Sequence, residues 1–165
     1  MTIAAPVLLD ASHWLDGFDC GEPTLDDWLQ RRAAGNAESG ASRCYIACDG
    51  AKVIGYYALA AGAVAQSAAT GKFRRNMPEP IPVIVLGRLA VDRSAQANGI
   101  GRALFRDAGM RVLQAASIVG VRGLLVSAIS DKAKAFYVAL GMVESPLNER
   151  VLMMTMKELQ VSLGA

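Results

Sequence analysis

The sequence predicts an α/β fold with a mixed sheet, in one domain that spans residues 1–165. Two strand-like runs, residues 43–48 and 52–60, flank Asp49-Gly50, and an Asp-Gly pair in that position is typical of a β-hairpin. Residues 83–91 are mostly apolar without clean alternation, as in a strand that is covered on both faces. Residues 101–119 repeat apolar side chains at helical spacing. Strands alternating with long helices indicate the α/β class.

The remaining elements are shorter and complete the order β-α-β-β-(α)-β-α-β-α-β. We expect a helix that opens at Pro23, with Thr24 as N-cap, and that gives way to a loop over residues 35–41. Another helix over residues 131–140 is capped near Ser130 or Asp131 and ends at Gly141. The other segments are expected to be a strand at 5–9, a short helix or loop at 64–70, an irregular stretch with three prolines at 71–82, a polar loop at 92–98, and strands at 122–128 and 151–156.

Composition narrows the class of protein. The chain is 53% hydrophobic with a net charge of +2, which excludes a disordered or fibrous protein. Residues 70–111 nevertheless hold eight basic and three acidic side chains, so a basic segment lies in the middle of the chain. Cys20, Cys44 and Cys48 lack metal spacing, and we expect buried thiols and no metal site. No signal peptide or spanning run is visible, so we expect a cytoplasmic protein without a membrane partner.

The stretch Gln96–Arg102 carries the main functional signal. It lies between the best predicted strand and the longest predicted helix. Gly99 and Gly101 allow backbone N–H groups to approach an anion, and the start of a helix adds unpaired donors and a partial positive charge. These features favour a cradle for a diphosphate. The dinucleotide and Walker patterns are absent, and the alternative is a tight strand–turn–helix connection without a ligand.

Gln96-x-x-Gly99-x-Gly101 resembles the acetyl-CoA signature of the GCN5-related N-acetyltransferase (GNAT) family. Lys134-Ala135-Phe136-Tyr137 followed by Leu140-Gly141-Met142 resembles another segment of that family, and the resemblance covers nearly the whole chain. It implies a mostly antiparallel central sheet flanked by helices, acetyl-CoA as co-substrate, and Tyr137 as the general acid. It also implies a cofactor site formed by Leu89, Ala90, Val91, Gln96, Ala97, Asn98, Gly99, Ile100, Gly101 and Arg102. The alternative for Tyr137 is a packing role.

A narrower resemblance is to the acetyltransferase toxins of type II toxin–antitoxin pairs. It rests on residues 25–29, 55–59, 74–82 and 86–92. The resemblance implies that the enzyme acetylates the α-amine of aminoacyl-tRNA and blocks translation. It further implies a ribbon-helix-helix antitoxin and a homodimer. One departure is that many such toxins have Gly-Arg or Gly-Lys after the motif glutamine, where this chain has Ala97-Asn98.

The strand over residues 83–91 contains no carboxylate, so it offers no strong base. A lysine amine, with a pKa near 10.4, is almost fully protonated at neutral pH, whereas an α-amine, with a pKa near 7.7–8.0, is partly neutral. An enzyme without a strong base therefore suits an α-amine. Either Asp92 or a water molecule remains available as a weak base.

Six side chains of the basic middle segment suit a nucleic-acid backbone: Lys72, Arg74, Arg75, Asn76, Arg88 and Arg93. The alternative is an ordinary solvated loop. Two other functions stay open. One is a GNAT enzyme that acetylates a small amine or a protein N-terminus, and the other is a non-catalytic CoA-binding or nucleic-acid-binding co-repressor.

Overall fold

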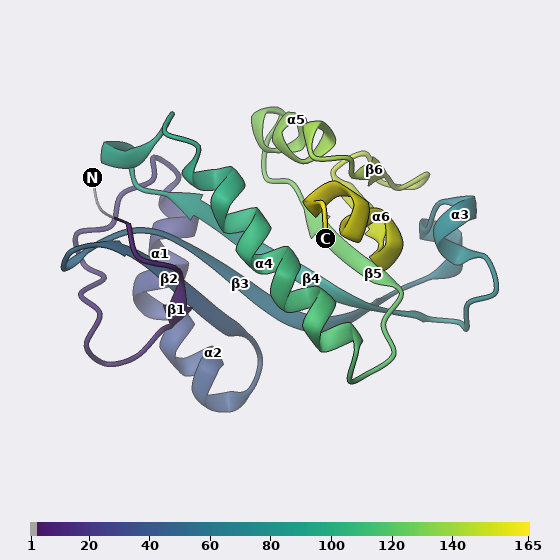
Figure 1. Ribbon diagram of the computed structural model, residues 1–165, viewed down its shortest axis with the longest axis horizontal. Coiled ribbons are helices and arrows are strands. Elements are labelled where there is room, and N and C mark those ends of the chain that lie inside the picture. Colours follow the sequence, from purple (N-terminus) through teal and green to yellow (C-terminus); the bar gives the residue numbers. More distant parts are fainter. Residues whose placement is uncertain (1–2) are drawn as a thin grey trace. The chain divides into compact units, whose positions relative to one another are not determined.

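The computed structural model describes residues 3–165 (Figure 1). The strands follow the order β1-β2-β3-β4-β5-β7-β6 in a seven-stranded sheet. The elements in chain order are β1 Val7–Leu8, α1 Pro23–Arg31, α2 Ala33–Ser39, β2 Arg43–Asp49, β3 Lys52–Val64, the 3₁₀ turn η1 Gln66–Ala68, α3 Gly71–Arg74, β4 Ile81–Val91, the 3₁₀ turn η2 Arg93–Ala95, α4 Ile100–Ala116, β5 Gly123–Ser127, α5 Asp131–Ala139, β6 Val143–Glu144, β7 Val151–Thr155 and α6 Met156–Leu163. The chain forms two compact units: Met1–Ala60 with Gly87–Ala108, and Ala61–Leu86 with Gly109–Ala165.

The first unit is built on the predicted hairpin. β2 pairs antiparallel with β3, β1 pairs antiparallel with β2, and Gly50 in the connecting turn has φ +61°. α1 buries Leu25, Trp28 and Leu29, which the helical repeat places on one face. Tyr56 of β3 fixes this helix, because its ring stacks on Trp28 at 5.9 Å and its hydroxyl donates to the Leu25 carbonyl at 2.7 Å.

Two predictions for this unit were wrong. Thr24 is not the N-cap of α1: Glu22 occupies that position without a side-chain cap, and Pro23 begins the helix because its missing N–H costs nothing there. Residues 35–41 are not a loop, since α2 runs over Ala33–Ser39. Ala33 is buried, and Gly40 takes the left-handed turn that ends this helix, at φ +84°.

The second unit contains the parallel part of the sheet. β4 pairs with β5 over Val83–Leu86, β5 pairs antiparallel with β7, and β6 pairs antiparallel with β7. Gly123 permits this packing, since a Cβ there would lie 2.1 Å from the Met154 carbonyl oxygen. Of the pairs described in the two units only β4–β5 is parallel, which confirms a mixed, mostly antiparallel sheet.

The second unit also holds elements that the sequence pattern did not indicate. The stretch over residues 71–82 is not wholly irregular: Thr70 Oγ1 caps α3, accepting from Phe73 N at 3.3 Å, and β4 begins at Ile81. α6 follows β7 directly and begins with a capping box between Thr155 and Glu158. By contrast α5 begins after Ser130 as predicted. Within residues 3–165, no helix is both long and apolar enough to cross a membrane.

Candidate active site

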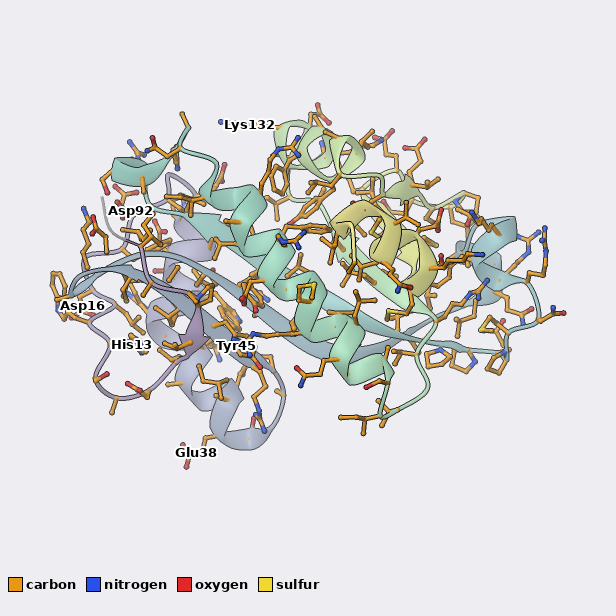
Figure 2. The ribbon with its side chains drawn as sticks, viewed as in Figure 1. His13, Asp16, Glu38, Tyr45, Asp92 and Lys132 are labelled. Atoms are coloured by element: carbon orange, nitrogen blue, oxygen red, sulfur yellow. The ribbon has the colours of Figure 1, made fainter. Side chains whose placement is uncertain are left out.

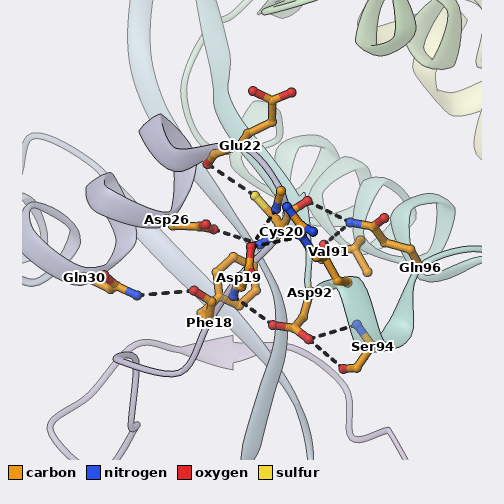
Figure 3. A network of polar contacts seen from close by, with 12 residues as sticks. Phe18, Asp19, Cys20, Glu22, Asp26, Gln30, Val91, Asp92, Ser94 and Gln96 are labelled. Carbon is orange, nitrogen blue, oxygen red and sulfur yellow. Dashed lines mark hydrogen bonds and ion pairs between the residues drawn. The ribbon is translucent and has the colours of Figure 1, made fainter.

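A buried carboxylate organises the turn at the end of β4 (Figure 2, Figure 3). Asp92 is 4% exposed, and one of its oxygens accepts from Ser94 N at 3.1 Å and from Ser94 Oγ at 2.6 Å. The other oxygen accepts from Asp19 N at 2.9 Å, and Lys52 Nζ lies 3.7 Å from the carboxylate. Burial raises the pKa of Asp92, but these hydrogen bonds and the Lys52 charge outweigh burial and hold it below its usual value. Asp92 is therefore ionised, and it caps η2.

Side chains of the following loop bind the protein's own main chain. Gln96 Nε2 donates to the carbonyls of Cys20 and Val91, both at 2.9 Å. Asn98 Nδ2 donates to the carbonyls of Ala95 and Gln96 at 3.2 and 3.3 Å. Both amides thus hold the loop in shape, and what the loop offers to a ligand is its backbone.

The backbone of this loop is arranged to receive an anion. Ala97 and Gly99 have φ +65° and +75°, and the first turn of α4 closes when Ala103 N donates to the Gly99 carbonyl at 3.1 Å. Outside the helices and strands, the main-chain hydrogen bonds described within residues 3–165 include none donated by residues 97–102, although residues 96–97 form a turn. N–H groups at the start of a 17-residue helix, with its partial positive charge, are an arrangement that can receive an anion. Leu89, Ala90 and Val91 lead into this loop, and the exposed Arg102 lies in the first turn of α4, beside Ile100 and Gly101.

Tyr137 lies in the second unit, on α5. Its side chain is 7% exposed and meets the Phe136 ring edge-on at 5.2 Å between centroids. Its carbonyl accepts from Leu140 N and Met142 N, at 3.1 and 3.2 Å, which fixes the turn at Gly141. Burial raises the pKa of the Tyr137 phenol, so the hydroxyl keeps its proton at neutral pH.

The structure brings Lys72, Arg74, Arg75 and Asn76 together, on α3 and the turn that follows it. Lys72 Nζ lies 3.5 Å from Glu158 Oε2, and Arg74 Nη1 donates to the Ala69 carbonyl at 3.3 Å. Arg75 and Asn76 are exposed, and Asn76 has φ +59°. Arg75 is the member of this segment whose charge has no partner among residues 3–165.

The other two predicted tRNA contacts, Arg88 and Arg93, belong to the first unit. The Arg88 guanidinium lies 4.6 Å from the centroid of the Trp28 ring, a cation–π contact on α1. Arg93 Nε lies 3.2 Å from Asp19 Oδ1. Both arginines thus have structural partners within the first unit.

Sequence reasoning missed several residues that support these sites. Asp19, Lys52 and Ser94 surround Asp92, and no local pattern links them because they come from three segments of the chain. Arg122 supports the basic segment, since its guanidinium donates to the carbonyls of Phe73 and Lys72 at 2.8 and 2.7 Å. Its position just before β5 gave no signal of this role.

The cysteines have no reactive features. All three are free, and burial raises the pKa of Cys20 and of Cys44 to about 12, so both stay protonated thiols. Within residues 3–165, no group of three His, Cys, Asp or Glu side chains is placed to hold a metal ion.

Comparisons with known proteins identify the family. The family model described as "Acetyltransferase (GNAT) domain" matches residues 40–144. A protein of Mycobacterium tuberculosis named "tRNA-acetylating toxin" is 46% identical over 161 residues, which cover 98% of this chain and 97% of that protein. The structure of AtaT complexed with acetyl-methionyl-tRNAfMet matches with a TM-score of 0.89 at 32% identity, over 97% of this chain and 98% of the other.

A second solved structure contains the co-substrate and an antitoxin. It is a mutant of the toxin AtaT bound to the C-terminus of the antitoxin AtaR and acetyl-CoA, and it matches with a TM-score of 0.84 at 31% identity over the full length of both chains. Both likenesses are of the whole fold, since they extend over 97% and 100% of this chain. The chain therefore belongs to the GNAT family of acetyltransferases, as the resemblance of its glycine loop and its Tyr137 segment predicted.

Proposed function

We propose that this enzyme transfers an acetyl group from acetyl-CoA to the α-amine of the amino acid on charged tRNA, and thereby blocks translation. The observation that carries the proposal is the 46% identity, across 98% of the chain, to a protein named for acetylating tRNA. The likeness to AtaT in complex with acetyl-methionyl-tRNAfMet supports it independently, because it extends over 97% of the chain.

The open amides of residues 97–102 bind the diphosphate of acetyl-CoA in this proposal. The cradle uses main-chain donors and the positive end of α4, so it needs no metal ion. Leu89, Ala90 and Val91 at the end of β4 hold the pantetheine arm. The three residues are half-buried or buried, which suits a ligand that lies along the strand.

The amine nitrogen attacks the thioester carbonyl carbon, and the carbon–sulfur bond then breaks. The departing sulfur takes the proton of the Tyr137 hydroxyl, and the phenolate then regains a proton from water, which its raised pKa favours. The nitrogen loses its proton to water. The α-amine of an aminoacyl ester suits this site, because it is partly neutral at neutral pH and needs no strong base. β4 holds no carboxylate, and the oxygens of Asp92 already accept hydrogen bonds.

The basic segment of residues 72–76 binds the phosphate backbone of the tRNA. Arg75 contributes most to this contact, since Lys72 and Arg74 are partly satisfied by Glu158 and the Ala69 carbonyl. Arg88 and Arg93 contribute by holding α1 and the cofactor turn. A charged-tRNA substrate places the reaction in the cytoplasm. The proposal also includes one domain over residues 1–165, a homodimer, and a ribbon-helix-helix antitoxin that neutralises the enzyme.

The test uses the purified enzyme, radiolabelled acetyl-CoA, and bulk tRNA that is either charged or deacylated. We expect acid-precipitable label on charged tRNA only, and its loss in Tyr137→Phe with the affinity for CoA unchanged. Label on small amines or on protein N-termini, with none on charged tRNA, would replace the proposed acceptor. Retained toxicity in Tyr137→Phe would instead indicate a non-catalytic binding module.

A further inference from the structure

We infer that Asp92 is a positioning residue, which latches the segment leading into α1, residues 19–22, to the acetyl-CoA loop so that the two are ordered together. The inference rests on the proposed use of the loop by acetyl-CoA. It assigns a role to the α1 lead-in, which contains no motif, and it removes Asp92 from the candidates for a base.

The lead-in is joined to the turn after β4 on both sides of η2 (Figure 3). On one side, Asp19 N donates to Asp92 Oδ1 at 2.9 Å and Arg93 N donates to the Asp19 carbonyl at 2.8 Å. On the other side, Gln96 Nε2 donates to the Cys20 carbonyl at 2.9 Å. The two ends of the turn that precedes the open amides are therefore tied to the same short segment.

The N–H groups of the lead-in donate to carboxylates. The N–H groups of Asp19, Cys20 and Gly21 donate to Asp92 Oδ1, Asp26 Oδ1 and Asp19 Oδ1, at 2.9, 3.0 and 3.0 Å. Gly21 has φ +95°, so the segment forms no regular element. Its N–H groups thus depend on side-chain acceptors, and the first of these is Asp92.

Asp92 also anchors the turn to the hairpin. Its N–H donates to the Ile54 carbonyl at 2.8 Å, and Lys52 Nζ from the same strand lies 3.7 Å from its carboxylate. With both oxygens accepting and only 4% of the residue exposed, Asp92 is not placed to receive a proton from an incoming amine. Its geometry is that of a brace between β3, the turn and the lead-in.

Coupling follows from this arrangement. A ligand that orders the loop over residues 97–102 also orders the lead-in, and a loosened lead-in weakens binding at the loop by the same factor. The contribution of the Asp92 hydrogen bonds should therefore appear in the affinity for acetyl-CoA, the donor that carries a diphosphate. Asp92 itself donates no hydrogen bond to that group.

The test compares Asp92→Asn and the milder Ser94→Ala, which removes only the 2.6 Å hydroxyl bond, with Asp27→Asn as control. Asp27 is an exposed carboxylate of the same unit, paired loosely with Arg31 at 3.8 Å. Each variant is assayed with acetyl-CoA and with S-acetyl-pantetheine, a donor that lacks the diphosphate.

We expect the KM for acetyl-CoA to rise about tenfold in Asp92→Asn and about threefold in Ser94→Ala. The KM for S-acetyl-pantetheine, the kcat and the acidic limb of the pH profile stay unchanged.

Hydrogen exchange provides a second readout, which does not require the substrate that accepts the acetyl group. CoA binding should slow exchange of the Asp19, Cys20 and Gly21 amides in the wild type, and this protection should be lost in Asp92→Asn. Equal loss of kcat with both donors, or a displaced acidic limb, would show that Asp92 takes part in the chemistry and would overturn the inference. Unchanged CoA affinity in both folded variants would also overturn it. A wild type that fails to bind CoA in calorimetry would instead refute the proposed function.

Discussion

Arg75→Ala should flatten the salt dependence of tRNA binding, because Arg75 is the residue of the basic segment over residues 72–76 whose charge has no partner among residues 3–165. Each phosphate contact contributes about 0.7 to 0.9 to the slope of log K against log salt concentration, for single strands and duplexes respectively. Between about 50 and 200 mM salt, loss of one such contact changes the ratio of wild-type to variant affinity by about threefold. Binding by the variant should therefore fall less steeply as salt is added.

The assay is fluorescence anisotropy with labelled charged tRNA across that salt range. Arg31→Ala is the matched control, since Arg31 is an exposed arginine of α1 that lies 3.8 Å from Asp27 and outside the basic segment. Its slope should equal that of the wild type. A slope in Arg75→Ala that is also unchanged, or that changes as much in Arg31→Ala, would refute the assignment of this segment to the tRNA backbone.

Three further predictions concern stability. Gly123→Ala should lower the free energy of unfolding by more than about 3 kcal/mol in urea titrations, because the new Cβ would lie 2.1 Å from the Met154 oxygen and neither strand can yield easily; a cost below about 1 kcal/mol would contradict that contact. Ala97→Gly should raise it by up to about 1 kcal/mol, since Ala97 holds φ +65° at a steric cost that glycine lacks; a lower midpoint in the variant would argue against strain there. Hydrogen bonds from Thr155 and the charge of Lys72 hold the pKa of Glu158 below its usual value, although burial raises it. The stability that Glu158 contributes is therefore present above the unfolded-state pKa near 4.5 and is lost as pH falls through the folded-state pKa. Glu158→Gln should therefore flatten the fall in urea midpoint between about pH 6 and 3, and an unaltered curve would count against the capping box as its source.

The glycine loop was predictable because its signal is local. Gly99 and Gly101 stand between a strand and a helix, and the chain geometry that they permit follows from neighbours in sequence. The roles of Gln96 and Asn98 were not predictable in the same way. Gln96 binds the Cys20 carbonyl, which lies 76 positions away along the chain, and no periodicity in the sequence indicates that contact.

The partners of the basic side chains were also not predictable from the sequence. Charge counts indicated where cations gather, yet Arg88 rests on Trp28 and Arg93 pairs with Asp19, partners that only the folded hairpin and α1 bring near. The missed helix α2 had a local cause. A loop was predicted from residue 35, whereas the chain stays helical to Ser39, because Ala33 gains burial and a glycine inside a helix costs only about 1 kcal/mol.

The main-chain donors of residues 97–102 also determine which mutations can inactivate the protein. Such mutations would be selected in cells that survive its expression. The donors belong to the main chain, so exchanging the exposed side chains of the loop leaves every donor in place. Inactivating missense mutations in a survivor screen should therefore be depleted at Arg102. They should be enriched at Gly99, whose φ of +75° penalises any Cβ, and at the buried Asp92. A shortage of inactivating side-chain changes in this loop would indicate that its function depends on the main chain.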